Sequence, residues 1–141
     1  ATILLHFDAV FIAPNAKIKY PFSDLGLAPE VGSSFLLFQS LGYQKAAQLL
    51  FESQPIDGNR YHELGLAKYV GKDFLDQANK YAHMLKEQSL SSIIETKAIL
   101  KSFMQEDIAK SRSMETAAMK KLFGSEDNIK AVEKFFAKKN K

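Results

Sequence analysis

The chain has 141 residues, enough for one domain, and its 46% hydrophobic and 25% charged residues exclude a disordered or collagen-like chain. It contains no cysteine, which excludes a disulfide framework and a thiolate nucleophile, and its three histidines do not stand at metal-ligand spacing. The formal net charge is only +3, with the basic surplus in the last third of the chain. This pattern favours a solvated helix face over a nucleic-acid partner.

The N-terminal run, residues 1–13, is apolar except for His6 and Asp8. It is too short to span a bilayer and lacks the basic residues that open a signal peptide. We therefore expect no membrane partner and a cytoplasmic location, or a peroxisomal or mitochondrial one in a eukaryote. The chain starts inside this apolar run rather than in a polar end, which predicts that it begins within a structural element.

Three short stretches in the first half have the apolar or alternating pattern of β-strands, namely residues 8–12, 16–20 and 66–70. Between them, turn and capping residues predict helices at residues 33–42, 44–52 and 57–64. Ser33 and Ser34 are expected to cap the first of these helices, and Asp57 the third.

The second half is predicted to be helical throughout, because residues 72–141 contain no proline and only one glycine. In residues 73–87 the apolar side chains recur on one face with helical spacing. Further helices are predicted at residues 90–103, 106–123 and 125–138. A few strands followed by an all-helical tail indicate an α/β (α+β) fold, with a boundary between residues 1–71 and residues 72–141.

A series of motifs follows in order along the first half: FDAVFIA at residues 7–13, AKI at 16–18, PF at 21–22, LGLAP at 25–29, AAQLL at 46–50, PID at 55–57 and ELGLA at 63–67. Together they resemble the crotonase (enoyl-CoA hydratase/isomerase) superfamily, and the likeness extends from Ala1 to about Lys139. The resemblance implies a crotonase-like ββα fold whose C-terminal part, with the active-site segment, is residues 1–71. Residues 72–141 would then be the helical oligomerisation region.

The resemblance also implies an acyl-CoA thioester substrate and a homo-trimer or hexamer. It implies no separate cofactor, because coenzyme A is part of the substrate, and no metal. The likeness covers only the second half of the family's domain. One N–H of the family's oxyanion hole is expected just before Ala1 and the other further upstream. We therefore expect the 141 residues to be a fragment or one part of a larger assembly, inactive by itself.

Acid/base residues distinguish the reactions of this family. By resemblance, the two glutamates of the hydratases fall at Thr2 and Phe22, and neither of these side chains exchanges protons near neutral pH. Glu30, in the sequence PEVGSS, matches a glutamate of the Δ3,Δ2-enoyl-CoA isomerases. A single carboxylate can take a proton from C2 and return one to C4 while the oxyanion hole holds the dienolate. Glu30 is therefore the expected catalytic residue.

Each of these residues has a structural alternative. Glu30 also suits a helix N-terminus, where a carboxylate meets the positive end of the helix dipole. Phe22 is expected to contact the substrate by filling the space that a hydratase gives to its water, but an aromatic residue after a proline is also typical of a core. Ser33 and Ser34 have no His/Asp partner spaced to activate them, so capping explains them better than nucleophilic catalysis.

Two residues near the C-terminus are expected to contact coenzyme A. The resemblance assigns Phe135 to the adenine and Lys138 to the 3′-phosphate, in some members from a neighbouring subunit. The alternative is an amphipathic helix with core phenylalanines and solvated lysines.

These expectations lead to one function: isomerisation of 3-enoyl-CoA to trans-2-enoyl-CoA in fatty-acid β-oxidation, by an enoyl-CoA delta isomerase. Three alternatives stay open. They are another crotonase-fold acyl-CoA enzyme such as a hydratase, a non-catalytic CoA-binding domain, and a basic interaction domain that only the lysine-rich tail supports.

Overall fold

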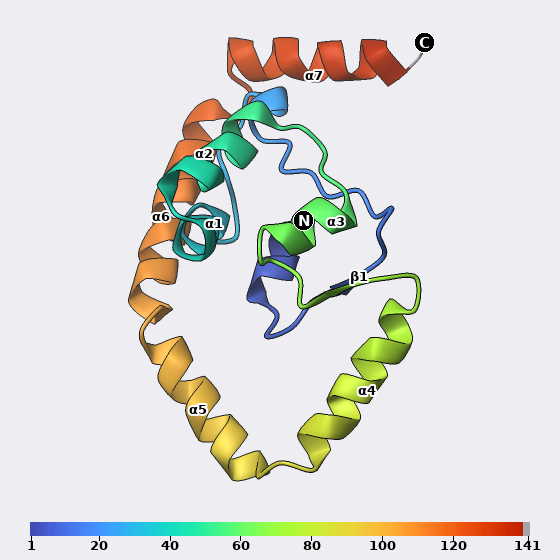
Figure 1. Ribbon diagram of the computed structural model, residues 1–141. Coiled ribbons are helices and arrows are strands. Elements are labelled where there is room, and N and C mark those ends of the chain that lie inside the picture. Colours follow the sequence, from blue (N-terminus) through green and yellow to red (C-terminus); the bar gives the residue numbers. More distant parts are fainter. Residues whose placement is uncertain (140–141) are drawn as a thin grey trace.

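The computed structural model describes residues 1–139, with side chains as far as Ala137 (Figure 1). In chain order the elements are η1 (Thr2–His6), β1 (Phe11–Ile12), η2 (Ser23–Leu25), α1 (Ser33–Leu41), α2 (Tyr43–Glu52), α3 (Gly58–Glu63), β2 (Tyr69–Val70), α4 (Phe74–Lys86), α5 (Leu90–Ser102), α6 (Gln105–Leu122) and α7 (Glu126–Lys139). The elements η1 and η2 are short 3₁₀ helices. Short strands followed by a long helical tail confirm the predicted mixed α/β fold.

The sheet is small. β1 and β2 pair in parallel, with Phe11 opposite Tyr69. The strands predicted at residues 8–12 and 66–70 are thus present but shorter than expected.

The strand predicted at residues 16–20 is wrong. This segment forms one isolated antiparallel bridge, in which Ile18 and Ile56 exchange two backbone hydrogen bonds of 2.9 Å. The following Pro21 has no N–H to donate, so it cannot extend a ladder.

The predicted helices are all present, with bounds that agree to within one or two residues. Asp57 caps α3 as expected, because its carboxylate accepts the N–H of Arg60 at 2.8 Å. The capping prediction for α1 is wrong, since Gly32 is the residue before the helix, and Ser33 and Ser34 lie inside it. A side chain from the distant helix α6 accepts the free N–H groups at this end instead.

The core lies between the sheet, the bridge and the three short helices. Its most buried side chains are Tyr20, Tyr61 and Leu37, which are at most 2% exposed. Burial raises the pKa of the Tyr20 and Tyr61 hydroxyls, so both stay neutral in the folded protein. Around them the buried apolar residues of the cluster are Val10, Ile12, Ile18, Phe22, Ala46, Leu50 and Ala67.

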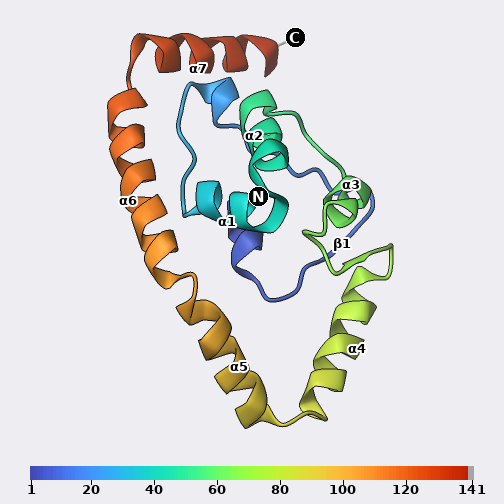
Figure 2. The ribbon, with the colours of Figure 1, turned by 60° about the vertical axis from the view of Figure 1, so that its left-hand side comes forward.

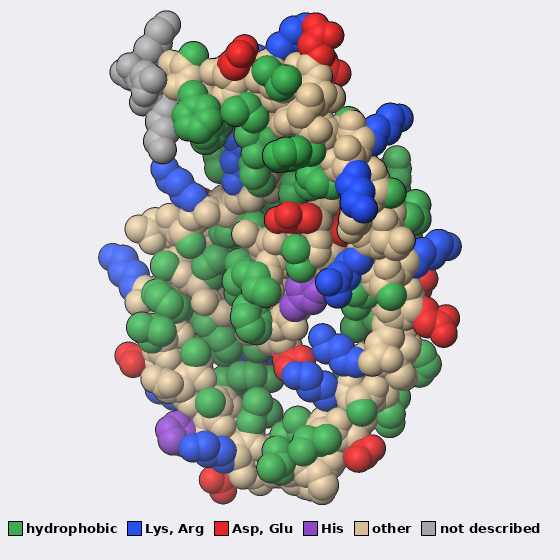
Figure 3. Space-filling model, turned by 180° about the vertical axis from the view of Figure 1, so that it is seen from behind, with side chains coloured by type: hydrophobic (Ala, Val, Ile, Leu, Met, Phe, Trp, Pro, Cys, Tyr) green, Lys and Arg blue, Asp and Glu red, His purple; other side chains and the backbone are tan. Residues whose placement is uncertain are grey.

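The helical tail wraps around this core as an arc. Helix α4 packs against β1 and β2, α6 packs against α1, and α7 packs against η2. Helices α4 and α5 form a V whose tip points away from the core. Helix α7 crosses the opposite end of the molecule (Figures 1 and 2). An opening separates part of the arc from the core (Figure 3). An ion pair between Lys97 of α5 and Asp8 joins the arc to the segment before β1.

Among residues 1–139, no helix combines the length and the apolar character needed to cross a membrane.

Candidate functional site

Glu30 lies in a tight turn, residues 29–34, which leads into α1 and is called the Glu30 turn below. Two consecutive residues, Val31 (φ 60°) and Gly32 (φ 74°), have a left-handed backbone. This conformation is ordinary for glycine but strained for β-branched Val31. The Ser33 N–H donates to the Glu30 carbonyl at 3.0 Å, which closes the turn. The Glu30 side chain itself is exposed.

A buried carboxylate from α6 holds one end of the Glu30 turn. Glu115 is only 6% exposed, and its Oε2 accepts the Gly32 N–H at 2.7 Å. Its Oε1 accepts the N–H of Ser34 at 2.9 Å and the hydroxyl of the same residue at 2.6 Å. The hydroxyl of Ser111, one helical turn earlier on α6, lies 3.2 Å from this oxygen. Glu115 therefore satisfies N–H groups at the start of α1 and places negative charge at the positive end of that helix.

A second side chain holds the turn from the opposite end of the chain. The Nε2–H of His6, at the end of η1, donates to the Val31 carbonyl at 2.8 Å. Helix α6 also approaches the backbone closely, because a Cβ on Gly32 would lie 3.3 Å from Cγ2 of Ile108. The strained backbone is thus fixed by groups from two separate elements, which is how such conformations persist in folded proteins.

Glu30 lines a cavity between its turn and α6, with a volume of about 260 Å³. Apolar, acidic and basic side chains share this cavity, and the other lining residues are Pro29, Val31, Arg112, Glu115, Thr116, Met119 and Lys120. An exposed carboxylate beside apolar groups can exchange a proton with a bound molecule, whereas Glu115 is already occupied by its hydrogen bonds. Glu30 is therefore the carboxylate of this cavity that is available for proton transfer.

The two residues at the hydratase positions lie outside this cavity. Phe22 is 7% exposed and belongs to the hydrophobic core, which is the environment of its structural alternative. Thr2 lies in η1, partly exposed. The expected contact of Phe22 with substrate stays a prediction.

Phe135 lines a different and larger cavity, of about 680 Å³, beneath α7. Its other lining residues are Lys19, Ser23, Asp24, Lys130, Ala131 and Lys134. Phe135 is 47% exposed and packs edge-on against Phe136, with 5.6 Å between the ring centroids. The side chain of Lys138 lies outside the described part of the chain. Glu30 and Phe135 are thus not brought into one cavity.

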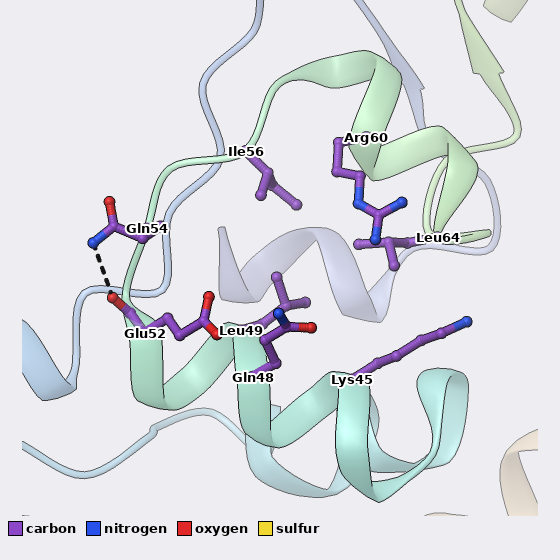
Figure 4. A pocket seen from close by; sticks show the side chains of 8 residues that line it. All are labelled: Lys45, Gln48, Leu49, Glu52, Gln54, Ile56, Arg60 and Leu64. Atoms are coloured by element: carbon purple, nitrogen blue, oxygen red, sulfur yellow. Dashed lines mark hydrogen bonds between the residues drawn. The ribbon is translucent and has the colours of Figure 1, made fainter.

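A third cavity, drawn in Figure 4, contains none of the candidate residues. It lies between α2 and α3, and charged side chains such as Lys45 and Arg60 line it (Figure 4). Its volume is about 100 Å³, enough for a few water molecules and less than half that of the Glu30 cavity. We therefore exclude it as the substrate site.

Sequence reasoning missed Glu115 and His6. They lie 83 and 25 positions from their backbone partners, so no local motif relates them to the Glu30 turn. One signal was available for Glu115. Ser111 and Glu115 interrupt the otherwise apolar stripe Ile108, Ala118, Met119 and Leu122 of α6, and polar residues on a packing face need buried partners.

Comparisons with known proteins agree on one family. The family described as "Enoyl-CoA hydratase/isomerase" matches residues 1–141. Enoyl-CoA delta isomerase 3, peroxisomal, of Mus musculus is 25% identical over 99% of this chain and 45% of its own length. Short-chain-enoyl-CoA hydratase of Clostridium acetobutylicum is also 25% identical, over 97% of this chain and 53% of its own length.

Solved structures give the same result. The crystal structure of an enoyl-CoA hydratase/isomerase from Pseudoalteromonas atlantica T6c superposes with a TM-score of 0.89 and 25% identity, over 97% of this chain and 56% of that one. The chain thus spans about half the length of the relatives it matches. Because an isomerase and a hydratase match at equal identity, these comparisons leave the reaction open.

Proposed function

Because this chain belongs to the enoyl-CoA hydratase/isomerase family, we propose that the whole protein is an enoyl-CoA delta isomerase of fatty-acid β-oxidation. It converts a 3-enoyl-CoA to the trans-2-enoyl-CoA. The observation that carries this proposal is the single available carboxylate, Glu30, on a fixed turn at the edge of a cavity. The hydratase positions hold Thr2 and Phe22 instead of carboxylates.

The reaction needs one base that works twice. The Glu30 carboxylate removes a proton from C2 of the substrate, and the electrons move into the thioester carbonyl to give a dienolate. The same carboxylic acid then returns the proton to C4, and the double bond forms between C2 and C3. No atom is gained or lost, so the reaction needs neither water nor a separate cofactor. The oxyanion-hole donors are those that the resemblance assigns upstream of Ala1.

The cavity beneath α7 suits the adenosine end of coenzyme A. Phe135 offers an aromatic face to adenine, and Lys134 forms no ion pair with a described residue. Lys19 and Lys130 are already paired, with Asp24 and Glu126. We assign Phe135 to adenine and Lys138, one turn after Lys134, to the 3′-phosphate. Like other members of its family, the protein is expected to be a homo-trimer or hexamer.

Replacing Glu30 tests the proposed chemistry. Glu30→Gln in the whole protein keeps the shape of the side chain and removes proton transfer, so kcat for a 3-enoyl-CoA should fall by at least about 100-fold. The KM should change little, because coenzyme A binds elsewhere. Turnover is followed by the absorbance of the conjugated trans-2-enoyl thioester. Glu95→Gln, an exposed site on α5, is the matched control and should leave kcat unchanged.

The same assay separates the hydratase alternative. The wild-type protein should hydrate crotonyl-CoA far more slowly than it isomerises 3-hexenoyl-CoA, because no second carboxylate activates water. Comparable rates for the two substrates, or near-normal turnover by Glu30→Gln, would contradict the isomerase assignment.

A further inference from the structure

Glu115 is the one buried carboxylate near the proposed catalytic residue that the reaction does not use. It lies on α6, 81 to 83 residues after the backbone groups that it binds, and it accepts the Gly32 and Ser34 N–H groups at 2.7 and 2.9 Å. These two N–H groups lie on the C-terminal side of Glu30. The turn between them and Glu30 contains Val31 in a strained left-handed conformation. The local hydrogen bond from the Ser33 N–H to the Glu30 carbonyl closes the turn but does not remove the strain at Val31, so the conformation depends on side chains from other elements, Glu115 and His6.

We infer that Glu115 is a positioning residue, which fixes the Glu30 turn so that the Glu30 carboxylate faces the reacting carbons. This inference rests on the proposed function. Both oxygens of Glu115 bind the turn, so the carboxylate fixes its orientation as well as its distance from α6. A relaxed turn would move the Glu30 backbone, and a misplacement of about 1 Å can cost roughly 100-fold in rate.

The hydrogen bonds explain why glutamine cannot replace this residue. A carboxylate offers two acceptors, whereas the amide of glutamine offers one oxygen and one NH₂ group. In Glu115→Gln, one of the two backbone N–H groups would therefore face another donor. The charge at the start of α1 would also be lost.

The first test is Glu115→Gln in the whole protein, assayed with a 3-enoyl-CoA. The kcat should fall about 10- to 100-fold. The KM should stay within about threefold of its wild-type value, since the cavity beneath α7 lies apart from this turn. The matched control is Glu106→Gln, an exposed glutamate on the same helix, which should keep wild-type kcat. A wild-type kcat for folded Glu115→Gln overturns the inference.

A double-mutant cycle separates positioning from a general structural role. If Glu115 acts through Glu30, then Glu115→Gln should change the residual rate of Glu30→Gln less than twofold. If the two losses multiply, Glu115 acts independently of Glu30 and the inference is wrong. If Glu30→Gln alone keeps near-normal turnover, the proposed function fails instead. In that case, faster amide hydrogen exchange at Gly32 and Ser34 in Glu115→Gln would still show that Glu115 holds the Glu30 turn.

A second variant covers the case in which Glu115→Gln fails to fold. Val31→Gly removes the steric strain of the left-handed turn, so Val31→Gly/Glu115→Gln should fold. Its kcat should lie about 10- to 100-fold below that of Val31→Gly, because the turn is then allowed but not held. Equal kcat values for these two proteins would mean that Glu115 only offsets strain, which overturns the inference.

Discussion

Two glutamates at the same turn have different environments, and the difference decides what each can do. Glu30 is exposed at the edge of a cavity, so its carboxylate is available to a bound molecule. Glu115 is buried and already accepts two backbone N–H groups. A carboxylate can take a proton from a substrate only if one of its lone pairs is accessible. A carboxylate that holds a turn in place has its lone pairs occupied by hydrogen bonds. The proposed roles follow from this assignment of hydrogen bonds rather than from residue type.

The aromatic side chain of Phe135 gives a prediction for coenzyme A binding at the residue scale. Phe135→Ala in the whole protein should raise KM for a 3-enoyl-CoA about tenfold, because a stacked aromatic contact contributes roughly 0.5–1.5 kcal/mol beyond its area. The kcat at saturating substrate should stay near wild type. Steady-state kinetics measure both constants.

Phe136 provides the control for this prediction. It neighbours Phe135 on α7, is 57% exposed, and does not line the cavity. Phe136→Ala should leave KM within about twofold. Equal effects of the two alanine variants on KM would contradict the assignment of adenine to the Phe135 cavity.

At the scale of elements, an asparagine of α7 and the glycine after η2 bring these two elements into close contact. The Nδ2 of Asn128 donates to the Leu25 carbonyl at 2.6 Å, and its Oδ1 accepts the Gly124 N–H at 2.9 Å. Gly26 (φ 62°) lies directly against α7, since a Cβ there would be 3.0 Å from Cα and N of Asn128. These atoms belong to the helix backbone and cannot move without moving α7.

Gly26→Ala should therefore separate α7 from η2. We expect a loss of about 2–4 kcal/mol in the free energy of unfolding, from the left-handed backbone and the clash together. Gly65→Ala is the matched control, because Gly65 has a similar φ of 78° but open space around its Cβ position. It should lose only about 1 kcal/mol. Urea unfolding of the whole protein measures both, and equal losses would mean that α7 does not pack tightly here.

At the scale of the whole molecule, the helical tail exposes much apolar surface. Large hydrophobic side chains in the segment from α4 to α7, helices and connections together, are 47–76% exposed, among them Leu75, Leu90, Ile99, Phe103, Phe123 and Phe135. The back view shows such side chains along the arc as well as over the core (Figure 3). Monomeric proteins rarely expose this many, so we expect these faces to contact other protein surface in the whole protein.

The 141 residues expressed by themselves should consequently self-associate or aggregate at micromolar concentration, and they should show negligible isomerase activity. The activity is expected to be absent because losing even one oxyanion donor costs about 100- to 1,000-fold, and the resemblance assigns both donors to residues before Ala1. Light scattering after size-exclusion chromatography measures the association. Adding the upstream half of the domain, fused or as a separate polypeptide, should restore turnover. Robust turnover by a folded, monomeric 141-residue chain would contradict both expectations.

Local chemistry determined the helices and the candidate base. Asp57 caps α3 through its carboxylate, and Gly42 and Gly124 follow the ends of α1 and α6, so short-range patterns were enough to predict these bounds. The PEVGSS motif selected Glu30, because family resemblance depends on order and spacing along the chain. The strand at residues 16–20 was mispredicted, since strands need a partner that the alternating pattern alone does not specify.

Only the tertiary structure decided how the Glu30 turn is held. The capping of α1 by Glu115, the bond from His6 to Val31 and the packing of Gly26 against α7 each join residues at least 25 positions apart. A long-range contact depends on where two elements meet in space, and periodicity within either element does not contain that information. The tertiary structure also separated Glu30 from Phe135 into two cavities and buried Phe22 in the core. Sequence therefore supplied the candidate chemistry, and packing determined which groups are free to perform it.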